Sequence, residues 1–142
     1  MWFDFKQKTQ VEPDFDGPMT LPWEKNERGN FWKLLHVRPA VVNLAGRGGV
    51  ATFFHRGVKP GWVFVCASDD LGDLFARAKD DPDICEFEMR GGVFVTWSYV
   101  KPGFRDGVVA HLRKTLKPEI QTCALDGNAK YAVEPIPVFA PA

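Results

Sequence analysis

The middle of the chain, residues 48–118, alternates strand-like and helix-like patterns of apolar positions. The segments GVATFFH (49–55) and WVFVCA (62–67) are rich in β-branched and aromatic residues and enclose the turn-forming RGVKPG. Two such runs around a turn predict an antiparallel hairpin. The segment VFVTWSYV (93–100) predicts a third strand, and bulky apolar residues on both of its faces are typical of a central position in a sheet.

Helical spacing follows the hairpin and again follows the third strand. Ser68 precedes Asp69 and Asp70, which gives a capping hydroxyl and two carboxylates at the start of a helix. The segments PDICEFEMR and FRDGVVAHLRKTL predict a second, short helix and a third helix that closes at Lys117-Pro118. The apolar residues of the first helix repeat at helical intervals and predict one buried stripe: Leu71, Leu74, Phe75 and Ala78.

Both ends of the chain lack this regularity. Residues 1–37 contain three prolines and alternate acidic with aromatic residues, which predicts an extended arm. Three further prolines restrict residues 126–142 to an extended tail. We therefore expect one α/β domain of the α+β type over residues 38–125, with a hairpin, a third strand and three helices.

The arm carries an unusual number of large rings for an extended segment. A ring left in water forgoes about 1.5 to 3 kcal/mol, so we expect these rings to be buried, either against the chain's own domain or in a protein partner. The second alternative predicts a partner-binding site, and arm exchange between copies would give a homo-oligomer. The predicted partner-binding residues are Trp2, Phe3, Phe5, Phe15 and Trp23.

The overall charge disfavours a protein that depends on nucleic-acid backbones. Lys and Arg total 18, as do Asp and Glu, and the pI is about 6.8, whereas such proteins usually carry a basic excess. A local patch remains an alternative, with Arg56, Lys59, Lys101 and Arg105 as its predicted nucleic-acid-binding residues. Strand aromatics could add stacking surfaces, although we expect most of them in the core: Phe53, Phe54, Phe94, Trp97 and Tyr99.

Other patterns predict neither a bound metal nor a cofactor. The three cysteines show no CxxC spacing, and the three histidines show no zinc-ligand spacing. The segment 46–49, GRGG, lacks the Lys-Ser/Thr of a phosphate-binding loop. The N-terminus has no signal-peptide pattern, and no apolar run approaches the ~18 residues of a membrane span. We expect a reduced, cytoplasmic protein that does not insert into membranes.

The order of these segments resembles the core of the GIY-YIG nuclease superfamily over residues 48–118. The shared features are the hairpin, a helix that begins SDDL, a third strand, and a helix that ends LKP. The resemblance implies a three-stranded antiparallel sheet flanked by helices. It would imply metal-dependent phosphodiester cleavage only if the two tyrosines, the arginine and the glutamate of the family were present.

None of these four polar residues stands at its expected position. Ala51 ends the triplet that matches G-I-Y, and Phe64 begins the triplet that matches Y-I-G. Counting along the helices places the family's arginine at Leu74 and its glutamate at Val109. An alanine, a phenylalanine, a leucine and a valine cannot move a proton, neutralise a phosphoryl group or hold a metal ion. The resemblance therefore implies a fold without the inherited catalysis.

Three functions remain as hypotheses from the sequence. The leading one is a non-catalytic GIY-YIG-like domain that serves as a protein-interaction, assembly or regulatory subunit through its aromatic arm. The second is a diverged metal-dependent DNA endonuclease that uses the substitutes Arg77 and Asp106, with His55 as the base. The third is a nucleic-acid-binding module that has lost catalysis.

Overall fold

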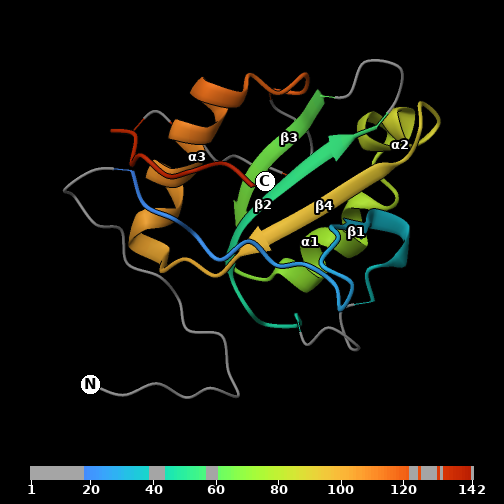
Figure 1. The fold of residues 1–142 in the computed structure, drawn as a ribbon, viewed down its shortest axis with the longest axis horizontal. Helices are drawn as coiled ribbons and strands as arrows, with labels where there is room; N and C mark the ends of the chain where they lie inside the picture. Colours follow the sequence, from blue (N-terminus) through green and yellow to red (C-terminus); the bar gives the residue numbers. More distant parts are fainter. Residues whose placement is uncertain are drawn as a thin grey trace.

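A four-stranded antiparallel sheet organises the computed structural model of the chain (Figure 1). The structure describes residues 18–38, 44–56, 61–121, 125, 131 and 133–141. The strands lie in the order β1-β4-β2-β3. The elements in chain order are β1 (Trp32–Lys33), the 3-10 turn η1 (Leu34–His36), β2 (Gly49–His55), β3 (Gly61–Ser68), α1 (Leu71–Ala78), α2 (Pro82–Glu88), β4 (Val93–Ser98) and α3 (Pro102–Leu116).

The fold confirms an α+β domain with an antiparallel, helix-flanked sheet, but the prediction of three strands is wrong. The fourth strand, β1, comes from the segment predicted to be an arm, and it pairs with β4 through Trp32↔Val95 and Lys33↔Phe94. Two residues are too short to show a strand pattern in the sequence. Because β1 occupies the edge, β4 lies inside the sheet, as its apolar residues on both faces predicted.

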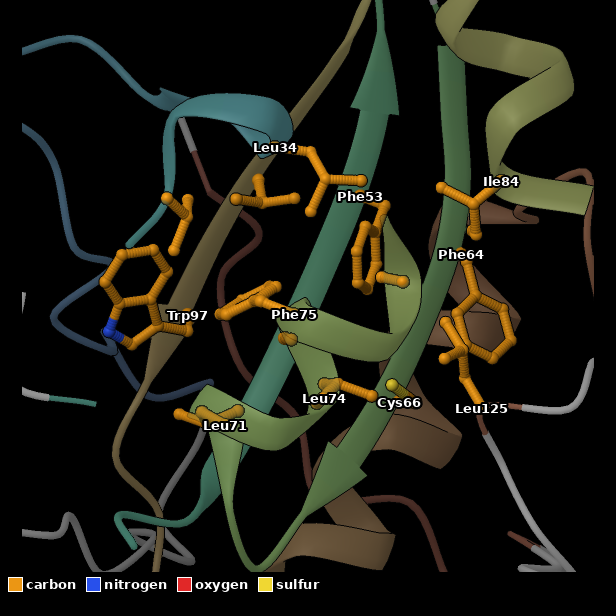
Figure 2. Packing of buried hydrophobic residues seen from close by; sticks show 14 of the residues in the cluster. Leu34, Phe53, Phe64, Cys66, Leu71, Leu74, Phe75, Ile84, Trp97 and Leu125 are labelled. Carbon is orange, nitrogen blue, oxygen red and sulfur yellow. The ribbon is translucent and has the colours of Figure 1, made fainter. Parts of the chain in front are cut away.

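Strand alternation divides the core into two clusters on opposite faces of the sheet. On the first face, Phe53 of β2 and Phe64 of β3 pack with Leu74 and Phe75 of α1 (Figure 2). On the second face, Val50 and Val65 pack with Val108, Val109 and Leu112 of α3. The helices α1 and α3 therefore cover opposite faces.

Carboxylates rather than a hydroxyl cap the two short helices. The Asp70 side chain accepts a hydrogen bond from the Asp73 amide at 3.1 Å and caps α1. This bond is the main reason that the pKa of Asp70 is lowered. Asp81 caps α2 by accepting from the amides of Asp83 and Ile84 at 2.9 and 3.1 Å. Ser68, the predicted capping hydroxyl, instead bonds to the backbone of Asp70.

Two extended segments from the ends of the chain lie side by side over the second face, drawn in blue and red in Figure 1. Met19 and Val138 form a parallel bridge, and the Met19 amide donates to the Pro137 carbonyl at 3.1 Å. Leu21 and Val138 are buried in the second cluster. The later part of the predicted arm and part of the predicted tail therefore contribute to one core.

Part of the outer edge of β3 is paired by the chain itself. The amides of Glu119 and Ile120 donate to the carbonyls of Trp62 and Val63 at 3.1 and 2.9 Å. The Arg113 guanidinium donates twice to the Val65 carbonyl, at 2.9 and 2.7 Å. Carbonyls that already accept hydrogen bonds within the chain are not available to pair with a strand of another molecule. Within the described ranges, no helix combines the length and apolar character needed to cross a membrane.

Candidate functional site

The four positions that the sequence resemblance assigned to catalytic residues lie in the core. Ala51, Phe64, Leu74 and Val109 all have 0% of their surface exposed. The first three belong to the cluster under α1, and Val109 belongs to the cluster under α3 on the other face. Two different parts of the core therefore fill these positions. Four polar substitutions would bury unpaired polar groups rather than open a shared pocket.

The three substitute catalytic residues lie on three different elements. Arg77 is exposed on α1, where its Nε donates to Asp73 Oδ2 at 2.9 Å. His55 is buried at the end of β2, with its Nε2 3.0 Å from Glu119 Oε2. Asp106 is exposed on α3. Because α1 and α3 cover opposite faces, the fold does not bring Arg77 and Asp106 to one site.

The last aromatic residue of the predicted partner-binding set packs within the chain. Trp23 is half-buried against the second cluster, and its Nε1 donates to the Phe139 carbonyl at 3.0 Å. For this tryptophan, the structure corresponds to the alternative in which the arm packs on its own domain. The other four predicted residues lie outside the described residues: Trp2, Phe3, Phe5 and Phe15.

The predicted basic patch does not form one surface. Arg105 is buried, and its guanidinium donates to the Val100 carbonyl and to Asp69 Oδ1, both at 2.6 Å. It lies beside Gly48, at the start of β2, whereas Arg56 follows the end of that seven-residue strand. A strand of this length spans roughly 20 Å. Lys101 is half-buried just before α3, and Lys59 lies outside the described residues.

Arg105 is part of a polar pocket of about 270 Å³ between β3 and α3. Asp69, Asp106 and Tyr131 also line this pocket. Burial lowers the pKa of Arg105, while the charges of Asp69 and Asp106 oppose that shift. One guanidinium between two carboxylates makes a structural ion pair and leaves little attraction for an anion. In the part of the chain that the structure describes, no group of three His, Cys, Asp or Glu side chains could hold a metal ion.

A second pocket, of about 280 Å³, lies where β2 ends and β3 begins. Phe31, Phe54 and Trp62 form its aromatic walls. The Phe54 ring lies 5.3 Å from Phe31, 5.6 Å from Trp62 and 5.6 Å from Phe94, centroid to centroid. All four side chains are half-buried. We call Phe31, Phe54, Trp62 and Phe94 the aromatic platform.

Cations surround the aromatic platform. The Arg56 guanidinium lies 4.5 Å from the centre of the Phe94 ring, and Lys33 Nζ lies 5.9 Å from it. Lys25 Nζ lies 5.1 Å from the centre of the Phe31 ring. No Asp or Glu stands among the described residues that line the pocket. The site therefore combines flat apolar surfaces with positive charge.

Sequence reasoning found this site only in part. Phe54, Phe94 and Arg56 were among the candidates, but Phe53, Trp97 and Tyr99 are buried in the core. Phe31, Trp62, Lys25 and Lys33 were missed. The missing information was the register of the strands, that is, which residues stand opposite each other. In the sheet, Phe54 stands opposite Trp62 of β3 on one side and opposite Phe94 of β4 on the other. Register is set by the whole sheet and cannot be read from one strand.

Comparison with known proteins leaves the chain without an assigned family. No family model, no curated protein and no solved structure matches it significantly.

Proposed function

We propose that this chain is a non-catalytic GIY-YIG-like domain that acts by binding, as an accessory or regulatory subunit of an assembly. The element order from β2 and β3 through α1, α2 and β4 to α3 supports the resemblance, because it follows the order that the sequence suggested. The observation that carries the proposal is the complete burial of Ala51, Phe64, Leu74 and Val109. Buried apolar side chains at these positions cannot catalyse a reaction, so the activity that we propose is binding.

Protein binding is assigned in this proposal to the arm before Pro18. Trp23 is already packed within the chain, so the partner contact rests on the rings that precede it. Trp2, Phe3 and Phe5 lie within four residues of one another, and a cluster of large rings is typical of an interface anchor. A cytoplasmic location belongs to the proposal, as expected from an odd number of cysteines without CxxC spacing.

A cleavage assay separates this proposal from the diverged nuclease. The full chain is incubated with branched, single-stranded and duplex DNA in the presence of Mg²⁺ or Mn²⁺, and we expect no cleavage. If products form, Arg77→Ala is compared with Arg90→Ala. Both arginines are exposed and pair with a carboxylate four residues earlier, so they form a matched pair. Cleavage that Arg77→Ala abolishes and Arg90→Ala preserves would overturn the proposal.

A truncation tests the arm. The structure indicates a start at Pro18, because a start near Arg38 would remove β1 and the buried Leu21. We expect the 18–142 chain to keep the circular dichroism spectrum and melting temperature of the full chain. It should lose the proteins that the full chain enriches from native lysate, measured by quantitative mass spectrometry. If both chains enrich the same proteins equally, the arm is not the partner-binding site.

A further inference from the structure

We infer that the aromatic platform binds single-stranded nucleic acid through base stacking, with nearby cations contacting the phosphates. This inference rests on the proposed function only in that the domain acts by binding. It does not involve the residues before Pro18, to which the protein partner is assigned. It also does not involve the positions that match the family's catalytic residues, because Phe54 points to the face opposite Ala51 and Phe53.

The first step is the shape of the platform. Strand alternation places Phe54 and its cross-strand neighbour Phe94 on one face of the sheet. Trp62 is opposite Phe54 because the register of β2 and β3 shifts by one residue after the Phe53↔Phe64 pair. The rings of Phe54 and Phe94 are stacked at 21°, whereas Trp62 meets Phe54 at 63°. The platform therefore offers a pair of nearly parallel rings with a third ring as a wall. Unpaired bases stack on such rings with little dependence on sequence.

The second step is the charge around the platform. Arg56 and Lys33 are exposed, and both approach the face of the Phe94 ring. Long cationic side chains at the rim of a stacking surface can reach a phosphate on either side of a stacked base. A cationic ligand such as a methylated lysine would meet the Arg56 guanidinium, and none of the described residues that line the pocket carries a carboxylate to balance it. Charge complementarity therefore favours an anionic, aromatic ligand.

The third step is the choice of a single strand. Bases in a duplex are stacked on each other and are not available to protein rings, so a flat platform selects unpaired bases. The whole chain carries a net charge of +0, which removes the long-range attraction that basic proteins use. We therefore expect binding that is modest in affinity and confined to this patch. With two or three phosphates contacted, a plot of the logarithm of the association constant against the logarithm of the salt concentration should have a slope of about −1.4 to −2.1.

The binding experiment uses the full chain and fluorescein-labelled oligomers of ten thymidines or ten uridines, with a duplex of equal length as the comparison. Fluorescence anisotropy at low salt should show saturable binding of both single strands and weaker binding of the duplex. Phe54→Leu and Trp62→Leu keep apolar bulk but remove the flat ring. Loss of one stacked base should weaken binding by about five- to 150-fold.

Matched variants control for folding and for charge. Phe104→Leu removes a half-buried ring on α3, outside the platform, and should leave binding unchanged. Arg56→Gln should make the salt slope shallower by about 0.7, the contribution of one phosphate contact to a single strand. Lys114→Gln, at an exposed position on α3, should leave the slope as it is. Melting temperatures show that each variant is folded.

Three outcomes would overturn the inference. One is the absence of binding by either single strand, and another is binding that neither Phe54→Leu nor Trp62→Leu weakens. The third is competition: a decaglutamate peptide displaces the labelled oligomer as readily as the unlabelled thymidine oligomer does. That result would mean that the patch binds any polyanion and does not stack bases. The non-catalytic proposal survives all three, because the cleavage assay decides it separately.

Discussion

Phe53 and Phe54 are adjacent in β2 and have opposite surroundings. Phe53 is fully buried between the sheet and α1, with Phe75 at 5.7 Å and Phe64 at 6.1 Å, centroid to centroid. Phe54 is half-buried on the other face, among the platform rings and Arg56. The same side chain is therefore core at one position and part of a half-exposed aromatic surface at the next. Strand alternation alone produces this difference.

The two faces differ in what covers them. The first face lies under α1 and η1, whose residues Leu34, Leu71 and Leu74 close it with aliphatic side chains. The second face lies under α3 and two extended segments, which cover Val50 and Val65 but leave the rings at the far end half-exposed. The two positions that the proposed resemblance assigns to catalytic tyrosines, Ala51 and Phe64, are core on the first face, whereas the inferred nucleic-acid site lies on the second face.

The largest expected effect comes from an arginine at position 74, where the proposed resemblance would place a catalytic arginine. Leu74→Arg places a charge in a fully buried position among Phe53, Phe64 and Phe75, with no designed carboxylate beside it. We expect a loss of about 3 to 5 kcal/mol or more in the free energy of unfolding, measured by urea denaturation. Such a loss would unfold much of a marginally stable domain.

Leu74→Met provides the control for this prediction, because it conserves volume and should cost less than about 1.5 kcal/mol. A folded Leu74→Arg variant with nearly unchanged stability would show that the first face has room for a polar site. That result would contradict the comparison of the two faces, and it would reopen the nuclease hypothesis.

The next effect compares Phe53→Ala with Phe54→Ala. Phe53→Ala removes a ring from a fully packed core and should cost about 3 to 5 kcal/mol. Phe54→Ala removes a ring that already contacts solvent, and we expect about 1 to 2 kcal/mol. Urea denaturation of both variants measures the difference in their free energies of unfolding, provided that the two curves have the same m-value. Equal losses would mean that the platform is as tightly packed as the core, and the distinction between the two phenylalanines would fail.

The parts of this fold that follow local rules were accessible from the sequence. The β2–β3 hairpin, the three helices and the interior position of β4 follow from turn residues, periodicity and apolar content. The pairing of Trp32–Lys33 with β4 and of Met19 with Val138 was not accessible. These contacts join segments far apart in the chain, and each is too short to carry a pattern of its own. The same holds for the platform, whose four rings come from three strands and a loop.

The smallest expected effect on stability concerns two threonines in the part of the sheet beneath the extended segments. Thr52 and Thr96 are cross-strand neighbours on the second face, and both are fully buried. Thr96 Oγ1 donates to the Glu24 carbonyl at 2.6 Å, whereas Thr52 Oγ1 has no hydrogen-bond partner among the described residues. A buried hydroxyl without a partner costs free energy, and a paired one contributes about 1 kcal/mol.

Replacing each threonine by valine should therefore change stability in opposite directions. We expect Thr96→Val to lose about 1 kcal/mol, because the Glu24 carbonyl loses its donor, and Thr52→Val to gain up to about 1 kcal/mol. Thermal unfolding of the two variants, each compared with the parent chain, measures the sign directly. If Thr52→Val is also destabilising, the Thr52 hydroxyl is bonded in solution, for example to a buried water. The extended segments would then cover a hydrated part of the second face rather than a dry one.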